Sequence, residues 1–245
     1  MKNIELLDCT LRDGGYHNDW AFGNGTLISV FERVVNSGVE FLELGFLDER
    51  RFFDLNRSIV PNTQGMRNIF GGLDRKKTKL VGMIDFGTCS LENIEPASES
   101  FLDGIRVIFK KHVRKPAMEF CRELKNRGYL VFSQLVSITS YTDCELMDLI
   151  ELVNDVRPYA VSIVDTYGLL HKNNLLHYYE ILDRGVNEDV AIGYHSHNNF
   201  QLAYANCIEL IEHHRGNCAG FCVMPHSMEW VKVRVMHQQS YFVCI

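Results

Sequence analysis

Two histidines separated by one residue, His195 and His197, have the type and spacing of metal ligands. They follow the apolar run Val190 to Tyr194, and alternate residues at the end of a strand point the same way, so both imidazoles can bind one ion. Surface or hydrogen-bonding histidines are the alternative for this pattern taken alone. Asp13 follows the first apolar run and adds a carboxylate. Two imidazoles and one carboxylate suit a divalent ion such as Mn²⁺, Mg²⁺ or Zn²⁺.

Arg12 stands beside Asp13 and adds a fixed positive charge to this group. A guanidinium stays charged and donates in a planar fork, so it can stabilise an enolate or a carboxylate next to the metal. Glu43, expected at the end of the next strand, would hold that guanidinium in place. The alternative is a structural ion pair that closes the mouth of a barrel.

Seven short apolar runs indicate the strands that must position these residues. Stretches of helical period lie between them, as in Leu27 to Val35, Met118 to Leu124, Leu146 to Val153 and Leu202 to Ile211. This alternation predicts a parallel sheet. The runs are Ile4 to Cys9, Glu40 to Phe46, Lys79 to Phe86, Gly104 to Phe109, Tyr129 to Val136, Ala160 to Asp165 and Val190 to Tyr194.

The choice between an open doubly wound sheet and a closed barrel rests on where the polar residues fall. No G-x-G-x-x-G loop follows the first run, as a dinucleotide fold would require. Polar residues instead end several runs, and in a barrel these ends meet at one rim. The sequence therefore predicts an α/β fold of the TIM (β/α)8 type. An eighth strand should follow the helix that ends near His214.

Composition narrows the class of protein and of partner. With 46% hydrophobic residues, 25 basic and 31 acidic side chains and a net charge of −6, disorder and a coiled coil are excluded. No apolar run reaches the ~18 residues of a membrane span, and the N-terminus lacks a signal peptide, so a cytoplasmic protein is expected. Neither nucleic acid nor a membrane is an expected partner, because no basic block is present. Five of the eight cysteines are expected to be small buried side chains, namely Cys9, Cys89, Cys121, Cys144 and Cys207.

Four motifs in this order resemble the DRE-TIM metallolyases, the HMG-CoA lyase-like superfamily, and are most similar to 4-hydroxy-2-oxovalerate aldolase-type proteins. The resemblance runs from Ile4 to about Gly216. Its motifs are Leu7 to Gly15, Glu43 to Gly45, Asp165 to Gly168 and His195 to Asn198.

The resemblance implies that Asp13, His195 and His197 bind the metal, with Mn²⁺ the first expectation and Mg²⁺ or Zn²⁺ as alternatives. It implies that Arg12 stabilises the enolate oxygen and that Glu43 is its partner. Stabilising the enolate left by carbon–carbon cleavage of a 2-oxo acid is then the main catalytic task.

The general base is less defined by the resemblance. In the aldolase branch a histidine stands three residues after the metal aspartate, where this chain has Tyr16, with His17 next. Either side chain could act as the base, and His17 could equally be an ordinary loop residue. Gln134 and Tyr141 could contact the substrate, but satisfying buried backbone groups is the commoner role of such residues, so both are left out of the catalytic set.

The expected activity is aldolase-type cleavage or formation of a carbon–carbon bond, in which a 4-hydroxy-2-oxo acid yields pyruvate and an aldehyde. A small-molecule 2-oxo acid is the expected substrate, and a homo-oligomer or a partner dehydrogenase stays open. The alternatives are a Claisen-type acyl-CoA synthase of the same superfamily and a non-catalytic barrel scaffold. The synthases carry C-terminal extensions for which this chain has no room, which favours the aldolase.

The chain divides into an incomplete barrel, residues 1–216, and an aberrant tail, residues 217–245. The tail lacks the family loop D-A-S-x-Y-G-M-G-x-G-x-G-N-x-x-T-E and has poor strand and helix periods, so the normal eighth strand is expected to be missing and activity impaired. Cys218, Cys222 and His226 could form a zinc site, although structural zinc usually has four ligands.

Codon arithmetic supplies another explanation of the tail. When each new codon begins with the third base of the old one, Met228 followed by Glu229 forces GGA, and Trp230 followed by Val231 forces GGT, both glycine. The choices from Met228 onward include G-M-G-K-G-P-G-N-A-P-T-E-L, which is the missing loop. We therefore interpret the tail as an out-of-frame sequence produced by a one-nucleotide slip near residues 215–220.

Overall fold

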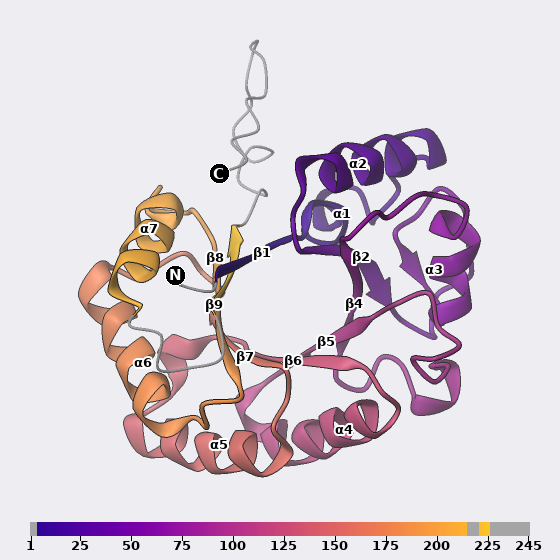
Figure 1. Ribbon diagram of the computed structural model, residues 1–245. Helices are drawn as coiled ribbons and strands as arrows, with labels where there is room; N and C mark the ends of the chain where they lie inside the picture. The colour runs from indigo at the N-terminus through magenta and orange to yellow at the C-terminus, as the bar shows by residue number, and fades with distance from the viewer. Residues whose placement is uncertain (1–3, 215–220, 226–245) are drawn as a thin grey trace.

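A single sheet curls into a ring of parallel strands with helices packed around its outside (Figure 1). The computed structural model describes residues 4–214 and 221–225. The strand order is β1-β9-β8-β7-β6-β5-β4-β2-β3, and a further β1–β2 pairing closes the ring. The strands are β1 (Ile4–Asp8), β2 (Phe41–Leu47), β3 (Ile59–Val60), β4 (Lys79–Asp85), β5 (Gly104–Phe109), β6 (Leu130–Leu135), β7 (Ala160–Asp165), β8 (Ala191–Ser196) and β9 (Phe221–Pro225). The TIM-type barrel is thereby confirmed.

Helices return the chain from the end of one strand to the start of the next. The α-helices are α1 (Thr10–Asp13), α2 (Asn24–Ser37), α3 (Thr63–Phe70), α4 (Arg114–Asn126), α5 (Asp143–Val156), α6 (Lys172–Gly185) and α7 (Ala203–His213). Short 3₁₀ helices are η1 (Gly14–His17), η2 (Leu91–Asn93), η3 (Lys111–Val113) and η4 (Ile138–Ser140). No helix within residues 4–214 and 221–225 is both long enough and apolar enough to cross a bilayer.

The predicted strands and helical faces agree with the structure to within one or two residues. Apolar side chains spaced at helical period are buried, as are Leu27, Phe31 and Val35 on α2. They pack between the ring of helices and the outer face of the barrel in one large cluster. One cysteine prediction is wrong: Cys144 is exposed, because it stands in the first turn of α5 on the face turned to solvent.

The prediction that the eighth strand position of the barrel is empty is wrong. Residues 221–225, which were expected to leave this position empty, form β9 and pair in parallel with both β1 and β8. The unpaired backbone groups of those two neighbours favour any extended segment placed between them, even one with a poor strand pattern. The pairing of β1 with its two neighbours is nevertheless short, with three residue pairs to β9 and two to β2. The rest of the tail, residues 217–220 and 226–245, lies outside the described residues, as do two of the three candidate zinc ligands, Cys218 and His226.

The inside of the barrel is built in layers. Leu7, Phe41, Val81, Phe132, Ala160 and Ala191 form an apolar plug inside the barrel, together with Cys9, which follows β1. Two residues beyond the plug residues of β2, β6 and β7 the buried positions are polar, namely Glu43, Gln134 and Ser162, because residues i and i+2 of a strand share a face. Arg106 of β5 lies among them and contacts Glu43 and Gln134. The sequence placed Glu43 at a strand end, but it lies inside β2 and is fully buried.

A bulge in β2 follows Glu43 and shapes the barrel around the site. The register between β2 and β4 shifts between Glu43 and Phe46. Gly45 has φ 153° and a Cβ there would collide with the carbonyl oxygen of Ser58. This close approach lets the Ser58 hydroxyl donate to the carbonyl of Leu11 at 2.7 Å. The bulge thus connects the strand that carries Glu43 to the turn that carries Arg12.

Candidate active site

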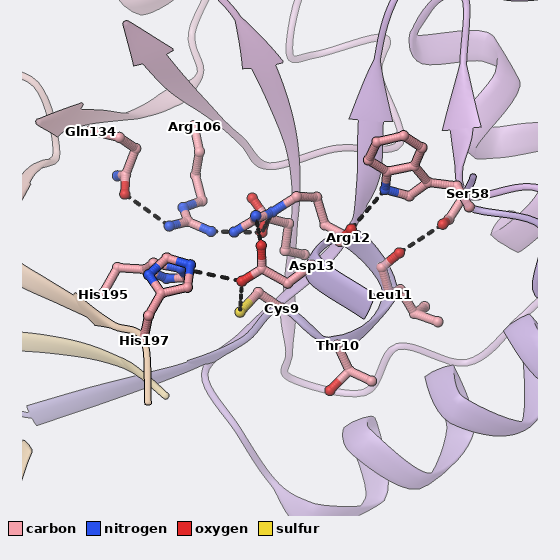
Figure 2. Close-up of polar contacts among 12 residues, drawn as sticks. Cys9, Thr10, Leu11, Arg12, Asp13, Ser58, Arg106, Gln134, His195 and His197 are labelled. Atoms are coloured by element: carbon pink, nitrogen blue, oxygen red, sulfur yellow. Dashed lines mark hydrogen bonds and ion pairs between the residues drawn. The ribbon is translucent and has the colours of Figure 1, made fainter. Parts of the chain in front are cut away.

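The turn after β1 carries Arg12 and Asp13 and is held by backbone hydrogen bonds. The N–H groups of Arg12 and Asp13 donate to the carbonyl of Cys9 at 3.1 and 2.8 Å. Trp20 Nε1 donates to the carbonyl of Arg12 at 2.7 Å, and the Ser58 hydroxyl bonds the neighbouring carbonyl (Figure 2). These bonds satisfy the carbonyls of a buried one-turn helix and fix the direction of its side chains.

Trp20 fits against this turn because Gly15 has no side chain. A Cβ on Gly15 would lie inside the Trp20 ring, whereas a Cβ on Gly14 would meet the Phe22 ring at 3.4 Å, an ordinary contact. Trp20 itself has φ 58° and is buried against Phe46, with ring centroids 5.3 Å apart. The indole is therefore a fixed support beneath the turn.

Gly15→Ala is expected to lower the free energy of unfolding by about 1–3 kcal/mol, because the added methyl group overpacks the Trp20 ring. Gly14→Ala is the matched control, and we expect it to leave stability within about 0.5 kcal/mol. Urea denaturation followed by tryptophan fluorescence measures both. Equal effects of the two substitutions would show that Trp20 does not pack as described.

A chain of buried polar side chains crosses the barrel beneath the turn. One carboxylate oxygen of Glu43 accepts from Arg12 Nε at 2.7 Å and from Arg106 Nη1 at 2.6 Å. Arg106 Nη2 donates to Gln134 Oε1 at 2.8 Å, and Gln134 Nε2 donates to Ser162 Oγ at 3.0 Å. All of these residues are at most 5% exposed. A lone buried charge would be costly, so each is stabilised by its neighbours in the chain.

Arg106 was not singled out from the sequence. It lies in the apolar run that forms β5, and a run of this kind indicates only a buried strand. The available signal was a charged residue at an inward position of a strand predicted to be buried, where a partner is obligatory. Gln134, which was left out of the catalytic set, proves to be a link in the polar chain and not a group at the rim.

Arg12 connects the row of buried polar side chains to Asp13. Its guanidinium forms an ion pair with the Asp13 carboxylate and lies 5.8 Å from the centroid of the Phe46 ring. Burial is the largest influence on the pKa of Arg12 and would lower it, but the interactions with Glu43, Cys9 and Tyr16, of which Glu43 is the strongest, together outweigh burial and raise the pKa above its ordinary value. Arg12 is thus a permanent cation at the centre of the barrel mouth.

Asp13 and His195 lie close enough to bind one ion. His195 Nε2 is 3.2 Å from Asp13 Oδ2, and Cys9 Sγ is 3.5 Å from the same oxygen. One ligand atom from each of these three residues lies within 4.8 Å of the others. Ligand atoms at ~2.0–2.3 Å from an ion are separated by about 3–4.5 Å, so the residues fit a divalent metal. Burial raises the pKa of the Cys9 thiol to about 12, so it is protonated in the metal-free protein.

His197 stands beside this group, just beyond the end of β8. Its ring centroid is 4.9 Å from that of His195 (Figure 2). Its Nδ1 lies 2.7 Å from the carbonyl oxygen of Asp165. Because a carbonyl only accepts, Nδ1 carries the proton and Nε2 has the lone pair that a metal needs. The Asp165 carboxylate accepts from the N–H groups of Leu169 and Leu170 and so holds its own loop.

The two candidates for the base lie in different surroundings. Tyr16 is half exposed and stacks edge-on against Trp20 and Phe46, with centroids 5.0 and 6.0 Å away. Burial raises the pKa of Tyr16, and the adjacent Arg12 charge opposes that rise. His17 is exposed at the end of η1. The structure therefore brings Tyr16, and not His17, next to Arg12.

Comparison with known proteins gives relatives of several activities. Oxaloacetate decarboxylase from Mycobacterium tuberculosis is 24% identical over 221 residues, covering 84% of this chain and 60% of that protein. 4-Hydroxy-2-oxovalerate aldolase from Bacillus cereus is 24% identical over 219 residues, covering 86% and 61%. A 2-isopropylmalate synthase from Sulfolobus acidocaldarius is 24% identical and is covered over 54% of its length. The chain thus spans under two thirds of these relatives.

Solved structures agree on the fold. Hydroxymethylglutaryl-CoA lyase from Pseudomonas aeruginosa superposes with a TM-score of 0.70 at 16% identity, covering 91% of this chain and 76% of that one. The HMGL-like family model matches residues 3–213, which include the turn after β1, the polar chain and both histidines. This match covers most of the sequence, and the chain therefore belongs to the HMGL-like family.

Proposed function

We propose that this chain is a divalent-metal-dependent aldolase that cleaves or forms a carbon–carbon bond of a 4-hydroxy-2-oxo acid. The observation that carries the proposal is the convergence of the Arg12 guanidinium with Asp13 and His195 in one buried place. The similarity to an aldolase and to an oxaloacetate decarboxylase supports it, since both reactions leave the enolate of pyruvate.

Asp13, His195 and His197 would hold the ion, with Mn²⁺ the first expectation. When bound, the metal would polarise the 2-keto oxygen and spread the charge of the enolate. Arg12 binds the keto and carboxylate side of the substrate through its planar fork, and Glu43 fixes the plane of that fork. The buried surroundings exclude water and so strengthen these electrostatic contacts.

Cleavage then needs one proton to leave and another to arrive. A base removes the proton of the 4-hydroxyl group, the bond between C3 and C4 breaks, and the aldehyde departs. The electron pair stays on the pyruvate enolate, which takes a proton at C3. Tyr16 lies beside Arg12 at the mouth of the site, where it can contact the 4-hydroxyl group; because its pKa is raised, the phenol is protonated there and acts as a hydrogen-bond donor, so the base is a different group.

Deuterium exchange of the pyruvate methyl group in D₂O tests the shared half-reaction. We expect exchange that needs a divalent ion and falls at least about 100-fold in Asp13→Asn, because a ligand carboxylate is lost. The metal content of the variant should fall as well. Asp148→Asn, an exposed aspartate on α5, is the matched control. Metal-independent exchange, or full exchange by Asp13→Asn, would overturn the proposed site.

The C-terminal tail is tested with a second version of the protein in the same assay. We propose that residues 217–245 are an out-of-frame sequence and that the loop they replace completes the site. A version carrying the alternative frame should exchange pyruvate protons faster than this chain. Sequencing of the coding DNA across residues 215–220 tests the frame itself; clean reads that encode the present tail would refute it.

A further inference from the structure

A pocket of about 380 Å³ opens at the carboxyl ends of β5, β6 and β7. These three strands are neighbours in the ring (Figure 1), so their loops form one sector of the rim. Polar side chains dominate its lining, namely Lys110, His112, Ser137, Thr139, Ser140 and Tyr167. The pocket is therefore part of the mouth through which a substrate reaches the buried site.

The two lysines that line this pocket, Lys110 and Lys111, differ in whether an acidic side chain pairs with them. Lys111 donates to Glu145 at 3.0 Å and to the carbonyl of Ser140 at 2.8 Å, so its charge is already neutralised. Lys110 is exposed and forms no ion pair with any residue in the described part of the chain. Asp85, at the end of β4, is an acidic group whose charge interacts with that of Lys110. Burial raises the pKa of Asp85, and the Lys110 charge opposes this rise.

Four hydroxyl groups surround Lys110 and His112. The side chains of Ser137, Thr139, Ser140 and Tyr167 make no hydrogen bond to residues 4–214. Ser137 has φ 56°, an unfavourable conformation for serine, and its N–H is held by the Thr166 hydroxyl at 2.7 Å. Backbone strain of this kind persists where the surroundings enforce it and is common in ligand-binding turns.

The pocket also lies in line with the buried site. Lys110 stands four residues after Arg106, one residue beyond the end of β5, and four residues of extended chain span about 13 Å at ~3.3 Å per residue. Tyr167 follows Asp165, whose carbonyl contacts His197, by two residues. The pocket and the buried site are thus joined by β5 and by the loop after β7, and the other end of a substrate held beside Arg12 would point toward this rim.

We infer that this pocket binds an anionic group, a carboxylate or a phosphate, on the aldehyde half of the substrate. The inference rests on the proposed aldolase function and narrows its substrate class to aldehydes that carry a negative charge. Lys110 supplies positive charge, and His112 and the hydroxyl groups can donate the hydrogen bonds that an oxyanion accepts.

Anion binding is measured directly on the full chain, without a need for activity. Titrations with inorganic phosphate and with acetate, followed by NMR, are run on the wild type, Lys110→Gln and Lys115→Gln. Lys115 is an exposed lysine of α4 outside the pocket and serves as the matched control. We expect Lys110→Gln alone to weaken binding about tenfold, because one charged donor is lost. Whichever anion binds more tightly identifies the substituent. No binding to the folded wild type, or equal weakening in both variants, overturns the inference.

Kinetics separate this inference from the proposed function. Glyceraldehyde 3-phosphate and glyceraldehyde differ by one phosphate, and succinic semialdehyde and butanal differ by one carboxylate. In condensation with pyruvate, Lys110→Gln should raise KM about tenfold for the charged member of the preferred pair and leave the uncharged one unchanged. Pyruvate exchange without any such preference would retain the aldolase and reject the anion site. Anion binding at Lys110 without pyruvate exchange, in this chain and in the version that carries the alternative frame, would reject the aldolase.

Discussion

Arg12→Lys is expected to lower the rate of pyruvate proton exchange by about 10²–10³-fold, the loss typical of removing one preorganised donor from a developing oxyanion. A lysine keeps the charge but has one ammonium group in place of the planar fork. It cannot contact Glu43, Asp13 and a substrate oxygen in the directions that Arg12 uses. The barrier therefore rises even though the net charge of the site is unchanged.

Metal content and substrate affinity distinguish this outcome from a collapse of the site. We expect Arg12→Lys to bind Mn²⁺ as the wild type does, because Arg12 is not among the proposed ligands. Arg51→Lys, in an exposed loop where the arginine pairs with Asp19, is the matched control and should exchange at the wild-type rate. If Arg12→Lys retained full exchange, the enolate would be stabilised elsewhere and the assignment of Arg12 would be wrong.

Glu43→Gln is expected to lower the free energy of unfolding by about 3–5 kcal/mol, the cost of breaking a buried ion pair by removing one partner. Arg12 and Arg106 both donate to the same Glu43 oxygen, and these three residues are at most 5% exposed. A neutral amide in this position leaves two buried guanidinium groups with one carboxylate fewer. The loss should therefore exceed that of an ordinary glutamate substitution.

Urea denaturation of the metal-free protein measures this effect without interference from ligand binding. Glu151→Gln on the exposed face of α5 is the matched control and should change stability by no more than about 0.5 kcal/mol. Comparable values for the two variants would show that the charge of Glu43 is not needed to hold the two arginines.

The sequence predicted the strands well because each is a short apolar run with clear limits. It also predicted that the residues after β1 and at the end of β8 would meet, because parallel strands of a barrel end at one rim. Asp13 and His195 do lie together. These are consequences of local pattern and of a general rule for the fold.

Contacts made across the barrel could not be predicted in this way. Arg106 is recognisable as part of the site only when Glu43 and Gln134 are seen on either side of it. The support from Trp20 depends on a loop with a positive φ, which no apolar pattern encodes. β9 forms because β1 and β8 present open edges, so its position is determined by its neighbours more than by its own residues.

The apolar plug beneath the polar chain has a consequence for the order of events in a catalytic cycle. Phe41, Val81 and Phe132 are buried in the apolar plug inside the barrel, so among the described residues the polar route to the proposed site is from the opposite mouth. In the proposed function the keto acid half binds deepest, beside Arg12, and the aldehyde half lies above it. Turnover by the proposed aldolase is therefore sequential in one direction: the aldehyde must leave before pyruvate, and in condensation pyruvate must enter first.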